Sequence, residues 1–170
     1  MAKAEVVAPR SRMFNTHIDL PAEQRVKVIA LLNQQLADTF DLYSQTKQAH
    51  WNVKGMHFYQ LHLLFDSLAS SMLGFVDLIA ERATALGGVA QGTARMAVSA
   101  STLPEYLPEA IDGKHHLEAL IIRYAAYAAS TRAAISACDE LGDLDTADLF
   151  TQVSRDVDKD LWFLEAHLQG

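Results

Sequence analysis

Five side chains that commonly bind metal ions are grouped around one short segment and the stretch that follows it: His50, His62, Asp66, Asp77 and Glu81. Imidazole and carboxylate groups together suit iron, zinc or manganese, and a set without thiolate argues against a structural zinc site of the cysteine type. So few strong donors in one chain would leave coordination positions open, as redox or Lewis-acid chemistry requires. Their spacing decides whether they can act together.

Two predicted helices position these residues. From about Pro21 to Asn52, apolar side chains recur at three- and four-residue steps. That stripe consists of Ile29, Leu32, Leu36, Phe40 and Tyr43. A second helix is predicted from about His57 to Leu86. Its stripe consists of Leu61, Phe65, Leu68, Met72, Phe75 and Ile79. Because Gly55 lies in the short connection, the two helices should form an antiparallel hairpin.

The hairpin brings the two histidines together. Positions equidistant from the turn face each other, and the mean of 50 and 62 is 56, inside the turn, so His50 and His62 should lie side by side. His62 and Asp66 are four residues apart and share a helix face, and Asp77 and Glu81 repeat that step.

One chain cannot unite the two pairs, because His62 and Asp77 are 15 residues and therefore roughly 22 Å apart on one helix. The mean of 62 and 81 equals the mean of 66 and 77. An antiparallel second copy would therefore set His62 against its Glu81 and Asp66 against its Asp77. Small side chains that permit close approach lie at this centre: Ser70, Ser71 and Gly74. The spacing predicts two identical sites across a two-fold dimer interface.

The ordinary interpretation of a single helical histidine or aspartate is a solvated or capping residue. Two isolated pairs at four-residue spacing are weak support for a metal site. Two pairs that share one centre, together with a histidine related by the hairpin, favour metal binding.

Longer segments around these residues resemble a known family. The sequence TKQAHWNVKG, then LHLLFD, then DLIAERATALGG is similar to the signature of Dps proteins, the "DNA-binding protein from starved cells" branch of the ferritin-like superfamily. The resemblance continues through LGGVAQGTAR and DTADLFTQVSRDVDKDLWFLEAHL, and it covers most of residues 21–168.

The resemblance implies an all-α, ferritin-like four-helix bundle that assembles from two-fold dimers into a hollow homododecamer. It places ferroxidase centres between subunits, with His50, His62 and Asp66 from one chain and Asp77 and Glu81 from the other. Ordinary ferritins hold their di-iron site inside one bundle with Glu-x-x-His pairs. This chain contains no such pair, which favours the intersubunit site.

The implied activity is oxidation of Fe²⁺, with hydrogen peroxide as the preferred oxidant and oxygen a slower one, followed by storage of ferric mineral. Removing both reactants would protect DNA from oxidative damage. Trp51 would lie next to the centre, either as a local sink for oxidising equivalents or as a packed interface aromatic. Zinc can occupy the same donors without redox chemistry, which leaves a non-redox site as an alternative.

A second alternative is a nucleoid protein that binds DNA without sequence preference. Such binding needs a dense basic patch to neutralise phosphates. The net charge is −7, and residues 1–20, expected to be a flexible tail, carry Lys3, Arg10 and Arg12 against Glu5 and Asp19. A dodecamer would multiply the negative charge twelvefold, which attracts Fe²⁺ and repels nucleic acid, although twelve weak tails gain avidity.

The remaining chain completes one domain, residues 21–168. Residues 87–112 form a long crossover, with a short helix expected near Leu103–Leu107. Further helices are predicted at about Gly113–Asp139 and Leu144–His167. Trp162 and Phe163 are expected to anchor the core or an interface.

Acidic residues cluster around the turn between the last two helices: Asp139, Glu140, Asp143, Asp145 and Asp148. A solvated acidic turn is the default interpretation. The family resemblance makes Asp139, Asp143 and Asp148 candidates for a channel that admits iron at a three-fold axis.

The compartment follows from absences in the sequence. No signal peptide is evident, no uninterrupted apolar run approaches the roughly 18 residues of a membrane span, and Cys138 is the only cysteine. A cytoplasmic location, with association to the nucleoid left open and no membrane partner, is the simplest expectation.

Overall fold

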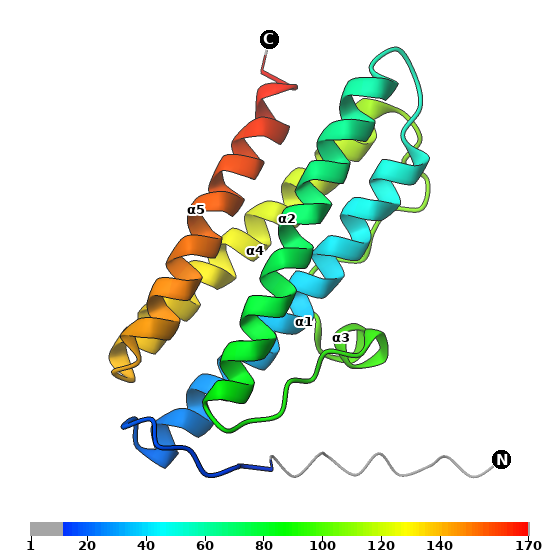
Figure 1. Ribbon diagram of the computed structural model, residues 1–170. Helices are drawn as coiled ribbons and strands as arrows, with labels where there is room; N and C mark the ends of the chain where they lie inside the picture. The colour runs from blue at the N-terminus through cyan, green and yellow to red at the C-terminus, as the bar shows by residue number, and fades with distance from the viewer. Residues whose placement is uncertain (1–11, 170) are drawn as a thin grey trace, which may run out of the picture.

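The computed structural model describes residues 12–169 (Figure 1). In this range the chain forms helices and no strands. The helices are α1 (Ala22–Asn52), α2 (Phe58–Ala85), α3 (Ala94–Ala100), α4 (Gly113–Glu140) and α5 (Leu144–Ala166). The four long helices begin and end within one residue of the predicted positions, which confirms the apolar periodicity as their main signal.

The long helices form a four-helix bundle of two antiparallel hairpins, α1 with α2 and α4 with α5 (Figure 1). The segment between α2 and α4 returns along the whole bundle, so α4 runs in the same direction as α2 (Figure 1). This is the long crossover that the sequence predicts.

The apolar stripe predicted for α2 is confirmed, and the stripe predicted for α1 is only partly buried. All six stripe residues of α2 are buried. On α1, Phe40 and Tyr43 are only half-buried, and Thr39 and Thr46 lie in the core instead. The Thr39 hydroxyl donates to the carbonyl of Gln35 at 2.6 Å and lies 2.6 Å from the hydroxyl of Tyr127. Buried polar groups are tolerated where hydrogen bonds replace water, so these threonines belong to the core.

The short helix of the crossover is α3, so its predicted position near Leu103–Leu107 is wrong. The Thr93 side chain caps α3 by accepting a hydrogen bond from the backbone N–H of Met96. Leu103 and Leu107 each precede a proline, and the proline ring disfavours helical conformation in the residue before it.

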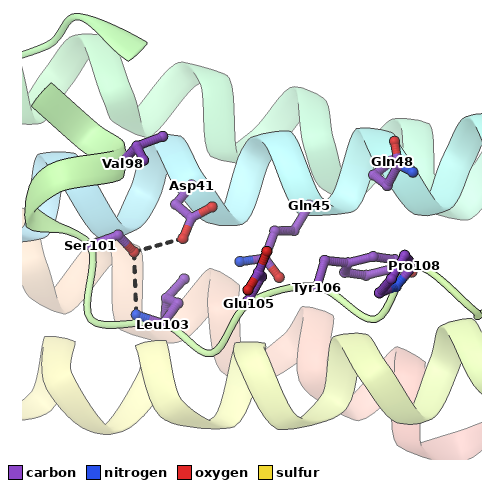
Figure 2. A pocket seen from close by; sticks show the side chains of 9 residues that line it. All are labelled: Asp41, Gln45, Gln48, Val98, Ser101, Leu103, Glu105, Tyr106 and Pro108. Carbon is purple, nitrogen blue, oxygen red and sulfur yellow. Dashed lines mark hydrogen bonds between the residues drawn. The ribbon is translucent and has the colours of Figure 1, made fainter. Parts of the chain in front are cut away.

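Polar side chains of α1 hold the non-helical part of the crossover. The Asp38 carboxylate is fully buried and accepts hydrogen bonds from the backbone N–H of Thr102, at 2.6 Å, and from its hydroxyl. Asp41 accepts a hydrogen bond from Ser101 at 2.7 Å (Figure 2). Side chains of α1 thus supply hydrogen bonds to a segment that has no regular backbone hydrogen bonding of its own.

Residues 12–20, the described part of the expected tail, lie against the other end of the hairpin. The N–H of Phe14 donates to the carbonyl of Gly87 at 2.7 Å, and Arg25 donates to the carbonyls of Leu20 and Leu86. Gly87 has a φ of +88°, and a Cβ there would collide with the carbonyl oxygen of Phe14. Glycine is therefore required where this segment crosses the end of α2. Residues 1–11 lie outside the described residues.

An ion pair ties α2 to the first turn of α5. The guanidinium of Arg82 donates to Asp143 at 2.7 Å and to the hydroxyl of Thr146 at 2.8 Å. The buried Asp143 carboxylate also caps α5 by accepting from the N–H of Thr146 at 3.0 Å. One carboxylate thus satisfies a helix terminus and a half-buried cation.

We expect Asp143→Ala to lower the free energy of unfolding by about 3 kcal/mol, because it removes a cap and leaves the Arg82 guanidinium without its buried partner. Urea denaturation at fixed protein concentration measures the change. Asp145→Ala is the matched control, since that exposed carboxylate is 3.9 Å from the same guanidinium. Equal losses in the two variants would show that the buried pair has no special role.

Candidate metal centre

The two histidines lie face to face where α1 ends and α2 begins. The Nδ1 of His50 is 2.7 Å from the carbonyl oxygen of His62, and the Nδ1 of His62 is 2.9 Å from the carbonyl oxygen of His50. Their rings stack with centroids 3.8 Å apart and planes inclined by 21°. The hairpin arithmetic is confirmed for this pair.

These two hydrogen bonds determine the tautomer of each ring. A carbonyl oxygen can only accept, so each Nδ1 carries the proton and each Nε2 of a neutral ring keeps its lone pair. A histidine whose other ring nitrogen donates to a carbonyl is oriented as metal-binding histidines usually are. His50 and His62 therefore present two preorganised nitrogen donors.

Asp66 lies beside this pair, one turn along α2. Its Oδ1 is 3.8 Å from the Nε2 of His50 and 2.7 Å from the ammonium of Lys47. The hydrogen bond from Lys47 lowers the pKa of the Asp66 carboxyl below its usual value. The carboxylate is thus ionised and half-exposed, and Lys47 occupies one side of it.

The other two predicted ligands are elsewhere in the chain. Asp77 and Glu81 are exposed residues farther along α2. Within residues 12–169 no three histidine, cysteine or acidic side chains of one chain are grouped so as to hold a metal ion. A single subunit thus places His50 beside His62 and beside Asp66 without forming a three-ligand group, and it leaves Asp77 and Glu81 elsewhere on α2.

Trp51 follows His50 at the end of α1 and is 62% exposed. The ammonium of Lys47 lies 5.7 Å from the centre of its ring, within the range of a cation–π contact. Lys47 therefore touches both the candidate ligand Asp66 and the neighbouring aromatic. Our sequence analysis missed it, although Lys47 precedes His50 by three residues and so shares its helix face.

The candidates for the iron channel differ in their surroundings. Asp139 and Asp148 are exposed, whereas Asp143 is buried in the pair with Arg82 and in the cap of α5. Of the two expected anchors, Trp162 is 58% exposed and Phe163 is half-buried, so Trp162 is outside the core of the subunit.

Comparisons with known proteins identify the family of this chain. Residues 29–170 match the ferritin-like domain family. The chain is 46% identical to the DNA protection during starvation protein of Agrobacterium fabrum over 158 residues, which are 93% of this chain and 98% of that one. It is 33% identical over 143 residues to the protein of the same name from Mycolicibacterium smegmatis, with 84% of this chain and 78% of that one covered.

Solved structures show the same relationship. DpsC from Streptomyces coelicolor superposes with a TM-score of 0.89 at 32% identity, covering 93% of this chain and 92% of that one. The Dps protein from Vibrio cholerae, described as a member of a broad superfamily of ferritin-like diiron-carboxylate proteins, gives a TM-score of 0.86 at 27% identity, covering 92% and 98%. The fold and the domain match define a ferritin-like protein. Within that class, the chain belongs to the Dps family.

Lys47 should weaken cation binding, because its ammonium already neutralises Asp66. We expect Lys47→Met to bind Zn²⁺ roughly threefold more tightly, a modest gain because a half-exposed ion pair competes weakly. Isothermal titration calorimetry at constant pH measures the affinity. Lys54→Met removes the same charge from an exposed lysine that touches Phe58 and not Asp66, so it is the control. An equal gain in both variants would mean that only net charge matters.

Proposed function

We propose that this protein is a ferroxidase and an iron store, built from two-fold dimers that assemble into a hollow dodecamer. The observation that carries the proposal is the stacked histidine pair, in which the Nε2 of His50 lies 3.8 Å from the ionised Asp66. The diiron-carboxylate relationship of the family supports iron as the metal. A cytoplasmic location is part of the proposal.

The exposed face of α2 supports the dimer. Large apolar side chains of this helix remain exposed in the single subunit: Leu63, Leu73 and Leu78. A side chain at Gly74 would begin in open space, because no atom lies within 4 Å of where its Cβ would be. Ser70 and Ser71 are exposed nearby. Small residues between exposed leucines suit close helix approach across a two-fold axis.

By length and composition alone, α2 would also suit a membrane span. An 18-residue window of the helix has a mean hydropathy of 1.6, and 33% of that window is buried. The ionisable residues Asp66, Asp77 and Glu81 interrupt the exposed part of the helix. Packing against a second copy of α2 would cover the apolar residues and would let these carboxylates bind a metal ion together. A lipid phase would cover the apolar residues but leave the carboxylates without a partner.

In the dimer, antiparallel packing about the centre between Ser71 and Met72 sets Glu81 of a second copy against His62 of the first, and its Asp77 against Asp66. Each dimer then has two complete centres. The carboxylates favour the ferric product, and the histidines fix the geometry. Two Fe²⁺ ions supply the two electrons that cleave the peroxide O–O bond, and two protons complete two water molecules.

Iron must reach these centres through the assembled shell. Asp139 and Asp148 are exposed near the α4–α5 turn and can contribute a negative potential where three subunits meet. Asp143 would act differently from its neighbours, because its carboxylate is already neutralised by Arg82. We propose that it shapes the turn that presents the other two.

The decisive experiment mixes the assembled protein anaerobically with Fe²⁺, adds hydrogen peroxide, and follows ferric absorbance against a protein-free control. We expect His62→Ala with Asp66→Ala to reduce the initial rate to that of the control, because each centre loses one nitrogen and one oxygen donor. Because loss of even an outer-shell partner of a ligand typically costs about 10–100-fold in activity, loss of two direct donors should cost about a hundredfold or more.

His57→Ala with Asp145→Ala is the matched control, since it removes the same residue types at exposed positions away from the histidine pair. A wild-type rate in His62→Ala with Asp66→Ala would overturn the site assignment. Zn²⁺ binding without any accelerated iron oxidation would instead favour the non-redox alternative, and the subunit number of the particle is measured on the same sample.

DNA protection, which the names of the relatives report, is proposed here to be chemical: consuming Fe²⁺ and peroxide together prevents hydroxyl-radical formation. The net charge of −7 opposes direct binding. We expect linear DNA to migrate freely in a gel shift at physiological salt with excess protein. A retarded band that strengthens as salt is lowered would contradict this expectation and support nucleoid binding through the tail.

A further inference from the structure

Asp160 is a buried carboxylic acid that the proposed iron chemistry does not use. It lies on α5, on the stripe that faces the core, together with Val157 and Leu164. The side chain is 8% exposed, and its Oδ2 has no hydrogen-bond partner among the described residues. Because buried polar groups are normally hydrogen-bonded, this oxygen needs an explanation.

The other two buried aspartates of the described chain have donors around them. Asp38 accepts hydrogen bonds from Thr102, and Asp143 accepts them from Arg82 and from the backbone N–H of Thr146. Asp160 lacks any such donor. A carboxyl group in these surroundings avoids the cost of an unpaired buried charge by keeping its proton.

The charges on α5 also favour the protonated form of Asp160. Burial raises the pKa of the Asp160 carboxyl to about 7, and the like charge of Asp156, one turn earlier on the helix, adds to the rise. Lys159 opposes the rise to a smaller extent, and its ammonium lies over the ring of Phe163, 5.6 Å from the ring centre. The carboxyl therefore changes its charge close to neutral pH.

The helices packed against α5 supply no cation that compensates this charge. α5 packs mainly against α4 and, to a smaller extent, against α2 (Figure 1). Every buried side chain of α2 is apolar, and its Arg82 pairs with Asp143 at the opposite end of α5.

α4 contributes neutral or distant groups. The phenol of Tyr124 is fully buried, and burial, with a smaller contribution from Asp160, raises its pKa far above neutrality, so it carries no charge. The other buried ionisable side chains of α4, His116 and Arg123, bond to the crossover instead. Ionisation of Asp160 would thus leave an unpaired negative charge between α5 and α4.

We propose that Asp160 is a proton-controlled latch for the C-terminal half of α5, residues 157–166. With the carboxyl protonated, this half of the helix docks against α4. When the proton leaves to solvent, the carboxylate needs water, and the undocked form that lets water reach it is favoured.

The direction of the pH effect follows from linkage between proton binding and docking. The carboxyl holds its proton more tightly in the docked form than in the undocked form, where its pKa returns toward 3.8. Docking is therefore strongest below about pH 4, weakens as the pH rises to about 7, and levels off above that value. Within this interval undocking releases one proton, so its equilibrium constant should rise about tenfold per pH unit.

The docked end of α5 also closes a cavity. His167 and Leu168, directly after the helix, line a cavity of about 490 Å³ together with Leu61 of α2 and Leu117 of α4. Undocking would open this cavity and expose its apolar side chains. Hydrolysis of ferric ions releases protons, so mineral growth in the proposed iron store would favour the docked form; this consequence, unlike the latch itself, rests on the proposed function.

The test measures amide hydrogen exchange in the assembled, metal-free protein from about pH 5 to about pH 8. Wild type and Asp160→Asn are compared at each pH, so that the base catalysis of exchange cancels. We expect the ratio of wild-type to variant exchange rates in residues 157–166 to rise at least about tenfold between pH 5 and pH 7, because only the wild type loses a proton. Binding of an apolar fluorescent dye should rise over the same range in the wild type only.

Asp145→Asn is the matched control, since it neutralises an exposed carboxylate at the other end of the same helix, and it should keep the wild-type pH dependence. Asp160→Leu buries no polar atom and should be as insensitive to pH as Asp160→Asn, which covers the case that asparagine disturbs folding. A ratio of wild type to Asp160→Asn that stays constant with pH, or one that Asp145→Asn reproduces, would overturn the inference.

The outcome is independent of the ferroxidase proposal, because no iron is present. Protein-dependent iron oxidation in a protein whose α5 is insensitive to pH would reject only the latch. A pH-dependent α5 in a protein that does not accelerate iron oxidation would reject only the ferroxidase.

Discussion

The site depends on two hydrogen bonds that cross the hairpin, from the ring of each histidine to the backbone carbonyl of the other. They close the end of α1 onto the start of α2, and they also fix which ring nitrogen stays free. The same two hydrogen bonds thus join the helices and orient the two imidazole rings. Because the acceptors are backbone carbonyls, His50 and His62 stay oriented without any carboxylate partner.

The length of α2 sets the next constraint. A helix rises about 1.5 Å per residue, so the two ligand pairs on one helix stay far apart however the bundle bends. In the proposed dimer a second copy unites them, and it also buries the leucines of α2 that are exposed in the single subunit. Burying apolar surface and completing the centre would then be one event, which couples oligomerisation to metal chemistry.

Periodicity predicted the long helices and the histidine pair, because both follow from regular spacing along α1 and α2. It failed where side chains act through hydrogen bonds between distant segments. Thr39 looks polar in the sequence and lies in the core because a tyrosine hydroxyl from α4 meets it. Lys47 was overlooked for a similar reason, since its partner Asp66 comes from the next helix. Spacing alone does not tell which polar residues will meet across a bundle.

The crossover depends on polar contacts of this kind. It has little regular structure, so its backbone groups need partners, and buried polar residues of α1 supply them: Asp38 binds Thr102, and Gln45 donates to the carbonyl of Pro104. Gln45 also accepts a hydrogen bond from the buried Arg123. These bonds fix the irregular segment that places Tyr106 against His116. Polar groups buried in α1 therefore determine how the connection between the two hairpins packs against α4.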